Sequence, residues 1–474
     1  MEITIVQKSL FGRGSLLRLD AEYVRGSDLT TELSILKYGA TTLEELTSEY
    51  VGPRLDEDYA SDEDIIDYID IDAVDTADGL TFSDQMPYGL RPSRAKYEVS
   101  PGDILISNVR PERGVVAYVT ERLSGKLASS GFTLLQPDAS SSIPQQFIYA
   151  FLRSSYGRRQ LVRRARGSMY PAVLGRDVGD IAVPDAPGRL VSRVVSLIDE
   201  AFRAHDEFFL HLTAGEQKMD SYIRNFGSPP GMYYGIDRVT SLTTVSSGLM
   251  SSESGMSRMD AEFFRGDYDE FARRIVDHGD YFPLGKYYDL RSGRIGGNDS
   301  SLVPTIKQAV LTNAGVNWSA VAEEPGEVRR GAAVEAGDIL LAATAHEIEY
   351  VGKKVDYVRA VPVDLQLANQ AVADVMILKP RQDKPESIRG SYVAAFLRHD
   401  AGKHQVQRCI RGLRGGHVYA RDLAIHVLVP VPDSRWLNEF EALASEAELT
   451  RNKAKTDTLE AVSLIDDWLS SSFE

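Results

Sequence analysis

Cysteine is nearly absent from this sequence, since Cys409 is the only one in 474 residues. A lone thiol excludes an internal disulfide and a thiolate zinc cluster within one chain. No run of 18 or more apolar residues occurs, which excludes an ordinary membrane-spanning helix. The first residues, MEITIVQKSLFGRG, lack the charged-then-apolar order of a signal peptide. The sequence therefore predicts a cytoplasmic protein.

Signatures of catalysis and of metal binding are also missing. There is no GxxxxGK[ST] phosphate loop and no HExxH pair. The segment Ser228-Pro229-Pro230 is the nearest match to the motif of enzymes that methylate base amines. Gly231 follows it in place of the required aromatic, and Pro-Pro-Gly is typical of a helix stop. The spacings of His399, His404 and His417 match no common zinc template. We predict a chain with no catalytic centre, no metal and no cofactor of its own.

Positive charge is in short supply overall, because the formal net charge is −16. Residues 49–78 hold twelve acids and one arginine, so this one segment accounts for most of the excess. Clustered carboxylates could bind a divalent cation. The alternation in DYIDIDAV instead favours a strand or solvated edge with its carboxylates outward. The global charge therefore does not decide whether nucleic acid is a partner, and local patches matter more.

The chain contains an internal repeat, found at offsets of 235 to 245 residues and always in the same order. RLDAEYVRG and RMDAEFFRG agree at six of nine positions. Further pairs are formed by two strand-like segments, by two basic segments and by two Arg-Asp dipeptides that follow them. The four pairs, in order, are 18–26 with 258–266, 99–107 (VSPGDILIS) with 334–342 (VEAGDILLA), 150–167 with 395–412, and 176–177 with 421–422.

Each repeat ends in an apolar segment that runs into proline, followed by a long heptad-like helical pattern. We expect two similar α/β (α+β) lobes in a pseudo-twofold arrangement, separated by two long antiparallel helices that form a coiled-coil spacer. The predicted boundaries are 1–188 for the first lobe, 189–227 for its helix, 228–433 for the second lobe and 434–474 for its helix. The seam of the helices is expected to supply partner-binding residues, namely Leu197, Phe208, Leu212, Phe440 and Ile465.

The strongest basic windows occupy the same place in both repeats. Residues 147–176 hold seven arginines and no acid, and residues 392–421 hold six Lys or Arg and one acid. Arginine suits DNA because its planar fork pairs with phosphates and with guanine edges. A solvated helix face that balances the acidic segment is the alternative. The candidate DNA-binding residues are Arg158, Arg159, Arg163, Arg164, Arg166, Ser168 and Tyr170 in the first repeat, and Lys403, His404, Arg408, Arg411, Arg414, His417 and Tyr419 in the second.

Together, the GDILIS and GDILLA strands, the AFLRSSYGRRQLVRRARGSMYP segment, the IAVPDAP and VLVPVPD exits and the two long helices resemble the specificity subunits of Type I restriction–modification systems. The resemblance covers nearly the whole chain. It implies two target-recognition domains, each reading half of a split DNA sequence. It also implies that the helices act as a spacer and dock two modification (methyltransferase) subunits, which carry S-adenosylmethionine. Motor-nuclease subunits can join for restriction.

Two departures from this family pattern keep another function open. The second repeat reads RGLRGGHVYARDL where the first reads RGSMYPAVLGRDV, and the acidity of 49–78 exceeds what DNA reading requires. The alternative is a duplicated DNA-binding module of another phage-defence or nicking complex, without a methyltransferase partner. A scaffold that never binds DNA would leave the duplicated arginine windows unexplained.

Overall fold

A computed structural model gives the fold of the chain. It describes Tyr23, Phe263 and residues 26–49, 61–138, 140–167, 170–229, 266–293, 301–312, 315–328, 331–345, 350–366, 369–383, 389–411 and 416–473. The chain divides into two compact units, 1–208 with 449–474, and 209–448. Each unit contains one lobe together with part of both long helices.

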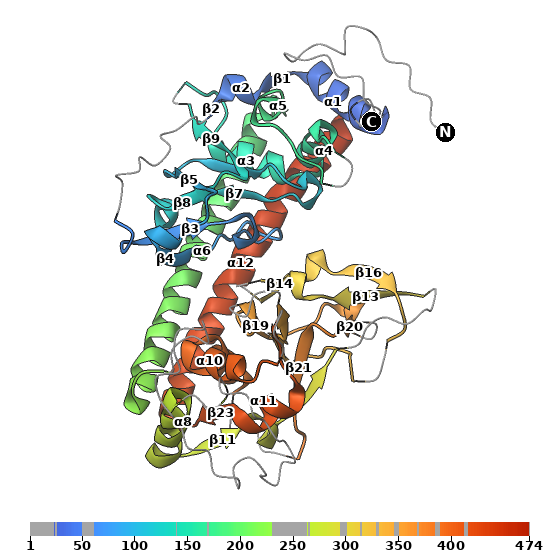
Figure 1. Ribbon diagram of the computed structural model, residues 1–474. Coiled ribbons are helices and arrows are strands. Elements are labelled where there is room, and N and C mark those ends of the chain that lie inside the picture. Colours follow the sequence, from blue (N-terminus) through green and yellow to red (C-terminus); the bar gives the residue numbers. More distant parts are fainter. Residues whose placement is uncertain are drawn as a thin grey trace. The chain divides into compact units, whose positions relative to one another are not determined.

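Unit 1 is built on two four-stranded sheets, with strand orders β2-β9-β6-β7 and β4-β3-β8-β5 (Figure 1). The pairing of β3 with β8 is parallel, and the other pairs in these sheets are antiparallel. The elements are α1 (Gly26–Tyr38), β1 (Ala40–Thr42), α2 (Leu43–Leu46), β2 (Thr47–Glu49), β3 (Ile65–Ile69), β4 (Asp84–Pro87), β5 (Ala95–Glu98), β6 (Ile104–Ser107), β7 (Val116–Tyr118), β8 (Leu127–Ser129), β9 (Phe132–Pro137), α3 (Gln145–Arg153), α4 (Ser155–Arg164), α5 (Gly175–Gly179), β10 (Ala182–Pro184) and α6 (Gly188–Ile223).

Strand β6, the predicted GDILIS strand, is buried on both faces, which explains its unbroken apolar run. Ile104 and Ile106 pack with helix α3 and with the long helices. Leu105 points to the other face, where it packs with residues of the second sheet such as Ile69 and Ala128. Unit 1 is thus layered as helices, sheet and second sheet.

Unit 2 repeats this plan with sheets ordered β12-β21-β17-β19 and β16-β13-β20, so its second sheet has three strands where that of unit 1 has four. The pairing of β13 with β20 is again parallel, so the predicted repeat is confirmed at the level of topology. Its elements are α8 (Gly266–His278), β11 (Tyr281–Pro283), β12 (Tyr288–Ser292), β13 (Leu302–Ile306), β14 (Leu311–Thr312), β15 (Gly315–Val316), β16 (Ala322–Pro325), β17 (Ile339–Ala342), β18 (Thr344–Ala345), β19 (Val355–Tyr357), β20 (Gln370–Ala371), β21 (Val375–Pro380), α9 (Gly390–Arg398), α10 (Asp400–Arg408), β22 (Gly416–His417), α11 (Ala420–His426), β23 (Leu428–Pro430) and α12 (Ser434–Phe473).

The Gly-Asp turns that enter β6 and β17 have the same geometry but different charge surroundings. Gly102 and Gly337 have φ values of 93° and 96°, and the following aspartates, Asp103 and Asp338, each accept a backbone N–H from three residues earlier. Lys379 Nζ lies 2.8 Å from Asp338 Oδ2. In β9 the corresponding residue is Gln136, and burial raises the pKa of Asp103 to about 6.

The two long helices pack antiparallel within each unit, as their seams predict. In unit 1, Arg193 pairs with Glu460 and Glu200 pairs with Lys453, so residue numbers rise along α6 as they fall along α12. In unit 2, Lys218 pairs with Glu439, and the rings of Tyr222 and Trp436 lie 5.1 Å apart. Helix α6 begins one residue before the predicted start.

The seam residues expected to bind partners are used by the chain itself. Leu197 and Ile465 are buried in the core of unit 1, and Phe208 is buried with its ring 6.3 Å from that of Phe82. Phe440 is buried in the core of unit 2, and Leu212 is half-buried. The expectation is therefore corrected for the four buried residues, because side chains already packed within the chain do not form a free docking surface.

Candidate nucleic-acid interface

Part of the first arginine window is structural. Arg163 and Arg164 are 3% and 2% exposed, and both pair with Glu32 of α1. Burial by itself would raise the pKa of Glu32, but the two guanidinium groups hold it below its usual value. The expectation that these two arginines face DNA is corrected, because both are buried and ion-paired with Glu32 inside the lobe.

The second repeat has a matching buried arginine, and in both repeats this arginine contacts the aromatic residue of the first repeated motif. Arg163 Nε donates to the Tyr23 carbonyl over 2.6 Å, and its guanidinium lies 4.0 Å from the centre of the Tyr23 ring. The buried Arg408 donates to the Phe263 carbonyl, with its guanidinium 4.4 Å from that ring. Tyr23 and Phe263 are the matching aromatics of RLDAEYVRG and RMDAEFFRG. His404 is also buried. The expectation that Arg408 and His404 face DNA is therefore corrected, as it is for Arg163 and Arg164.

A second pair of matching arginines anchors a loop in each lobe. Arg166 Nη2 lies 2.8 Å from Asp177 Oδ2, and Arg411 Nε lies 2.7 Å from Asp422 Oδ2. The backbones of Arg166 and Ala172 exchange hydrogen bonds, and the Arg411 N–H donates to His417 in the same way. Asp177 and Asp422 are the aspartates of the repeated Arg-Asp dipeptides, and each ion pair fixes the start of the loop to the helix that follows it.

Each anchored loop is hydrogen-bonded to the loop that follows a central sheet strand, β6 in lobe 1 and β17 in lobe 2. In lobe 1 the Val173 N–H donates to the Asn108 carbonyl over 2.8 Å, and Val109 bridges to Ala172. In lobe 2 the Val418 N–H donates to the Ala343 carbonyl over 3.1 Å, and β18 pairs with β22. We call residues 107–115 with 166–167 and 170–177 the loop pair of lobe 1, and residues 342–345 and 350–353 with 411 and 416–422 the loop pair of lobe 2.

The loop pair of lobe 1 carries exposed basic side chains and an exposed aromatic, and α4 adds two exposed arginines. Tyr170 is 67% exposed. The Arg158 side chain lies against Gly114, because a Cβ on that glycine would come within 3.2 Å of Arg158 Cδ. Arg110 is half-buried, and Arg113, Arg158, Arg159 and Arg176 are exposed. Sequence reasoning missed Arg110 and Arg113, although the SNVRPERG segment directly after the GDILIS strand would have signalled a basic loop.

The loop pair of lobe 2 holds a different set of groups. Arg411, Tyr419 and Arg421 are exposed, and the Arg411 guanidinium lies 5.8 Å from the Tyr419 ring centre. His417 Nδ1 lies 2.6 Å from Thr344 Oγ1. Lys403 is half-buried and pairs with Asp400. Ser168 and Arg414 lie outside the described residues.

The two predicted aromatics do not occupy matching positions. Tyr419 precedes α11 as its N-cap, and the matching residue before α5 is Leu174. Tyr170 lies on the loop itself, four residues before Leu174. The two lobes therefore present different chemistry on one framework, as expected if they contact different base pairs.

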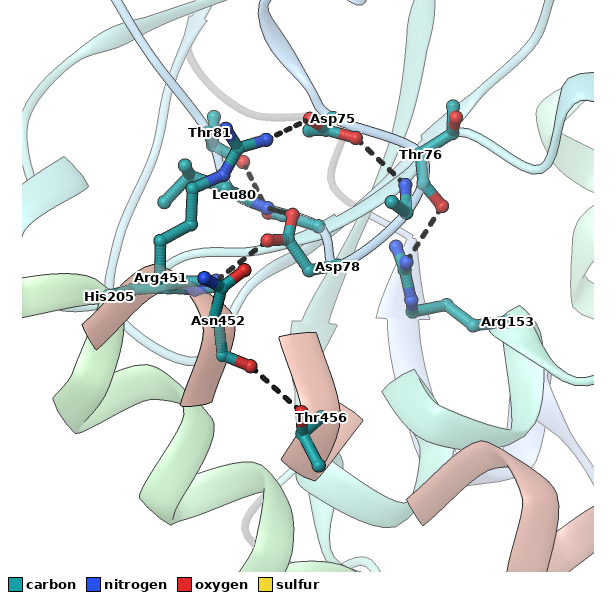
Figure 2. A network of polar contacts seen from close by, with 12 residues as sticks. Asp75, Thr76, Asp78, Leu80, Thr81, Arg153, His205, Arg451, Asn452 and Thr456 are labelled. Atoms are coloured by element: carbon teal, nitrogen blue, oxygen red, sulfur yellow. Dashed lines mark hydrogen bonds and ion pairs between the residues drawn. The ribbon is translucent and has the colours of Figure 1, made fainter. Parts of the chain in front are cut away.

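Two acids of the segment 49–78 are buried rather than outward, and Figure 2 shows their polar contacts. Asp75 and Asp78 follow β3, and the long helices supply their polar partners. Arg451 Nη2 is 2.9 Å from Asp75 Oδ2, and His205 Nε2 is 3.7 Å from Asp78 Oδ2. Burial would raise the pKa of Asp78, but His205, Arg451 and the Leu80 amide lower it to about 2. Asp75 and Asp78 therefore fix lobe 1 to its helices and are not solvated. Asp67, Asp70 and Asp72, the acids of DYIDIDAV, are half-buried or exposed on and after β3.

The helices of the described residues include none long and apolar enough to cross a membrane. The fold defines a class of chain in which two tandem α/β lobes, each with a paired loop surface, are each followed by a long helix. No family model and no curated protein matches the sequence.

The chain is similar to solved structures along nearly its whole length. One belongs to a study of complex assembly and conformational transition of the type I R-M system, with 18% identity, 92% of this chain and 97% of that chain covered, and a TM-score of 0.32. The HsdS subunit from Thermoanaerobacter tengcongensis shares 16% identity over 90% and 95% of the two chains, with a TM-score of 0.31. The Type-I restriction-modification system S subunit from M. genitalium shares 14% over 92% and 95%, with a TM-score of 0.33. At such identities and TM-scores, the function of this chain has to be argued from its own residues.

Proposed function

We propose that this chain is the DNA sequence-recognition subunit of a complex like the Type I restriction–modification enzymes. Each lobe would read one half of a bipartite target through its loop pair, and the two lobes would be related by a pseudo-twofold axis. The observation that carries the proposal is the duplicated loop pair, built on one framework and lined by exposed arginines and an aromatic. Charge attracts the phosphates, and different side chains on a common frame suit different base pairs.

In this proposal the chain binds and positions but does no chemistry. Methyl transfer would belong to two modification subunits that bind S-adenosylmethionine and dock on the long helices. Exposed apolar side chains on these helices, Leu210, Leu449 and Leu459, are better candidates for that contact than the buried seam. Motor-nuclease subunits would join for restriction, and the complex would act in the cytoplasm.

Binding of the full chain to mixed duplexes at several salt concentrations tests the DNA assignment. Arg113 and Arg159 are exposed, so Arg113→Ala and Arg159→Ala should each flatten the log–log salt slope by about 0.9. Arg193→Ala is the matched control, because this exposed arginine of α6 already pairs with Glu460. If the chain binds no duplex, or if all three variants behave alike, DNA recognition by the loop pair and α4 of lobe 1 is wrong.

A second measurement tests the methyltransferase partner. The chain and a modification subunit encoded beside it are purified separately and together, and transfer of labelled methyl groups to DNA is followed. We expect transfer only from the mixture. Specific DNA binding without any transfer in the mixture would favour the alternative, a recognition module that serves a different effector.

A further inference from the structure

The loop between β6 and β7 contains a residue in an unusual backbone conformation. Arg110 has φ 53° and ψ 59°, the left-handed region, and it is the one non-glycine residue with positive φ among those the structure describes. Glycine adopts this conformation at no steric cost, so the turn by itself does not favour arginine. A strained residue held in place by its neighbours points to a use for its side chain.

The backbone N–H and carbonyl of Arg110 both form main-chain hydrogen bonds. Its N–H donates to the Pro171 carbonyl over 2.8 Å, and its carbonyl accepts the Arg113 N–H over 2.9 Å. The first bond joins Arg110 to the facing loop and the second closes the turn over Pro111–Arg113. These contacts hold the strained conformation, and they fix where the side chain leaves the loop.

The guanidinium of Arg110 is held against an aromatic and is not neutralised. It lies 5.8 Å from the centre of the Tyr170 ring, within the range of a cation–π contact. Arg110 forms no ion pair with a carboxylate in the part of the chain that the structure describes, whereas Arg166 on the facing loop pairs with Asp177.

Lobe 2 lacks this arrangement at the matching place. Val109 of the lobe 1 bridge corresponds to Thr344 of β18, so the position after it, Arg110 in lobe 1, is Ala345 in lobe 2. The nearby polar contact in lobe 2 is the one between Thr344 and His417. The position therefore distinguishes the two lobes.

We propose that Arg110, backed by Tyr170, reads a guanine in the half-site bound by lobe 1. This inference rests on the proposed function and deepens it. Phosphate contact needs only a nearby cation, which the exposed Arg113, Arg158 and Arg159 already supply. A guanine offers two acceptors, O6 and N7, to a planar fork with a defined direction, and a guanidinium within cation–π range of Tyr170 on a hydrogen-bonded backbone meets that requirement.

The test selects bound duplexes from a randomised library with the full chain and compares sequence preferences. Arg110→Ala should lower the preference for one guanine in one half-site by about 10- to 100-fold and leave the other half-site unchanged. Arg110→Gly should lose the same preference while relieving the backbone strain, and its melting temperature should be at least that of Arg110→Ala. Arg113→Ala, the control on the same loop, should lower affinity for all sequences and keep the guanine.

The outcomes separate the two proposals. If the unaltered chain enriches no sequence, the proposed function fails and this inference fails with it. If it enriches a bipartite site and both Arg110 variants keep every preference, only the inference fails. A loss of affinity that is equal for all sequences in the Arg110 variants would make Arg110 a phosphate contact and would also overturn the inference.

Discussion

Removal of the Arg163 side chain should loosen lobe 1 rather than weaken a contact with DNA. Arg163 is buried, donates to the Tyr23 carbonyl, and pairs with Glu32. Breaking a buried ion pair costs about 3–5 kcal/mol, but Arg164 remains to neutralise Glu32. With hydrogen bonds to charged groups contributing about 1.5–3 kcal/mol, we expect Arg163→Ala to destabilise unit 1 by about 2–4 kcal/mol.

Hydrogen–deuterium exchange of peptides from α1 and α4 measures this loss where it occurs. A change of that size should speed exchange by about 30- to 900-fold if the region opens as one unit. Arg159→Ala is the matched control, since Arg159 lies one turn earlier on α4 and is exposed. The effect of Arg159→Ala on stability should stay within about 0.5 kcal/mol. It should flatten the DNA salt slope more than Arg163→Ala does.

The opposite pattern would refute the reasoning. If Arg163→Ala exchanges like the unaltered chain but flattens the salt slope by about 0.9, then Arg163 contacts phosphate and its burial against Glu32 does not persist in the working protein.

Three further changes test the packing and the electrostatics of unit 1. A Cβ at Gly157 would lie 2.2 Å from the Phe151 carbonyl oxygen, so Gly157→Ala should cost about 1–3 kcal/mol in urea unfolding, and no loss would show that α3 and α4 can separate freely. Ala454 is fully buried in the helix contact, so Ala454→Leu should lower the melting temperature, whereas an unchanged value would contradict the tight helix packing. Since the pKa of Asp103 is about 6 in the folded chain, its stabilisation is complete below its usual pKa and is lost as pH rises through 6, by up to about 3 kcal/mol. Gln136→Lys should flatten the stability between pH 5 and 7, as urea unfolding at the two pH values would show, and an unaltered slope would mean that another group is responsible.

The repeat and its layout were readable from the sequence because they depend on local pattern. The matches of GDILIS with GDILLA and of the two arginine segments predicted two lobes of one topology, and the heptad spacing predicted α6 and α12 to within a few residues. Glycine with positive φ and apolar periodicity are properties of short segments, so one sequence suffices to place them.

Tertiary structure decided which charged residues are available to a ligand. Arg159 and Arg163 lie one turn apart on the same helix and look alike in the sequence, yet one is exposed and the other is paired with Glu32, more than a hundred residues away. Asp78 is likewise buried beside His205 of a distant helix. Whether a charge faces water or an ion-pair partner depends on chain segments that meet only in the folded lobe. For this reason the candidate interface centres on the loop pair around Arg110 and Tyr170 and not on the buried arginines of α4.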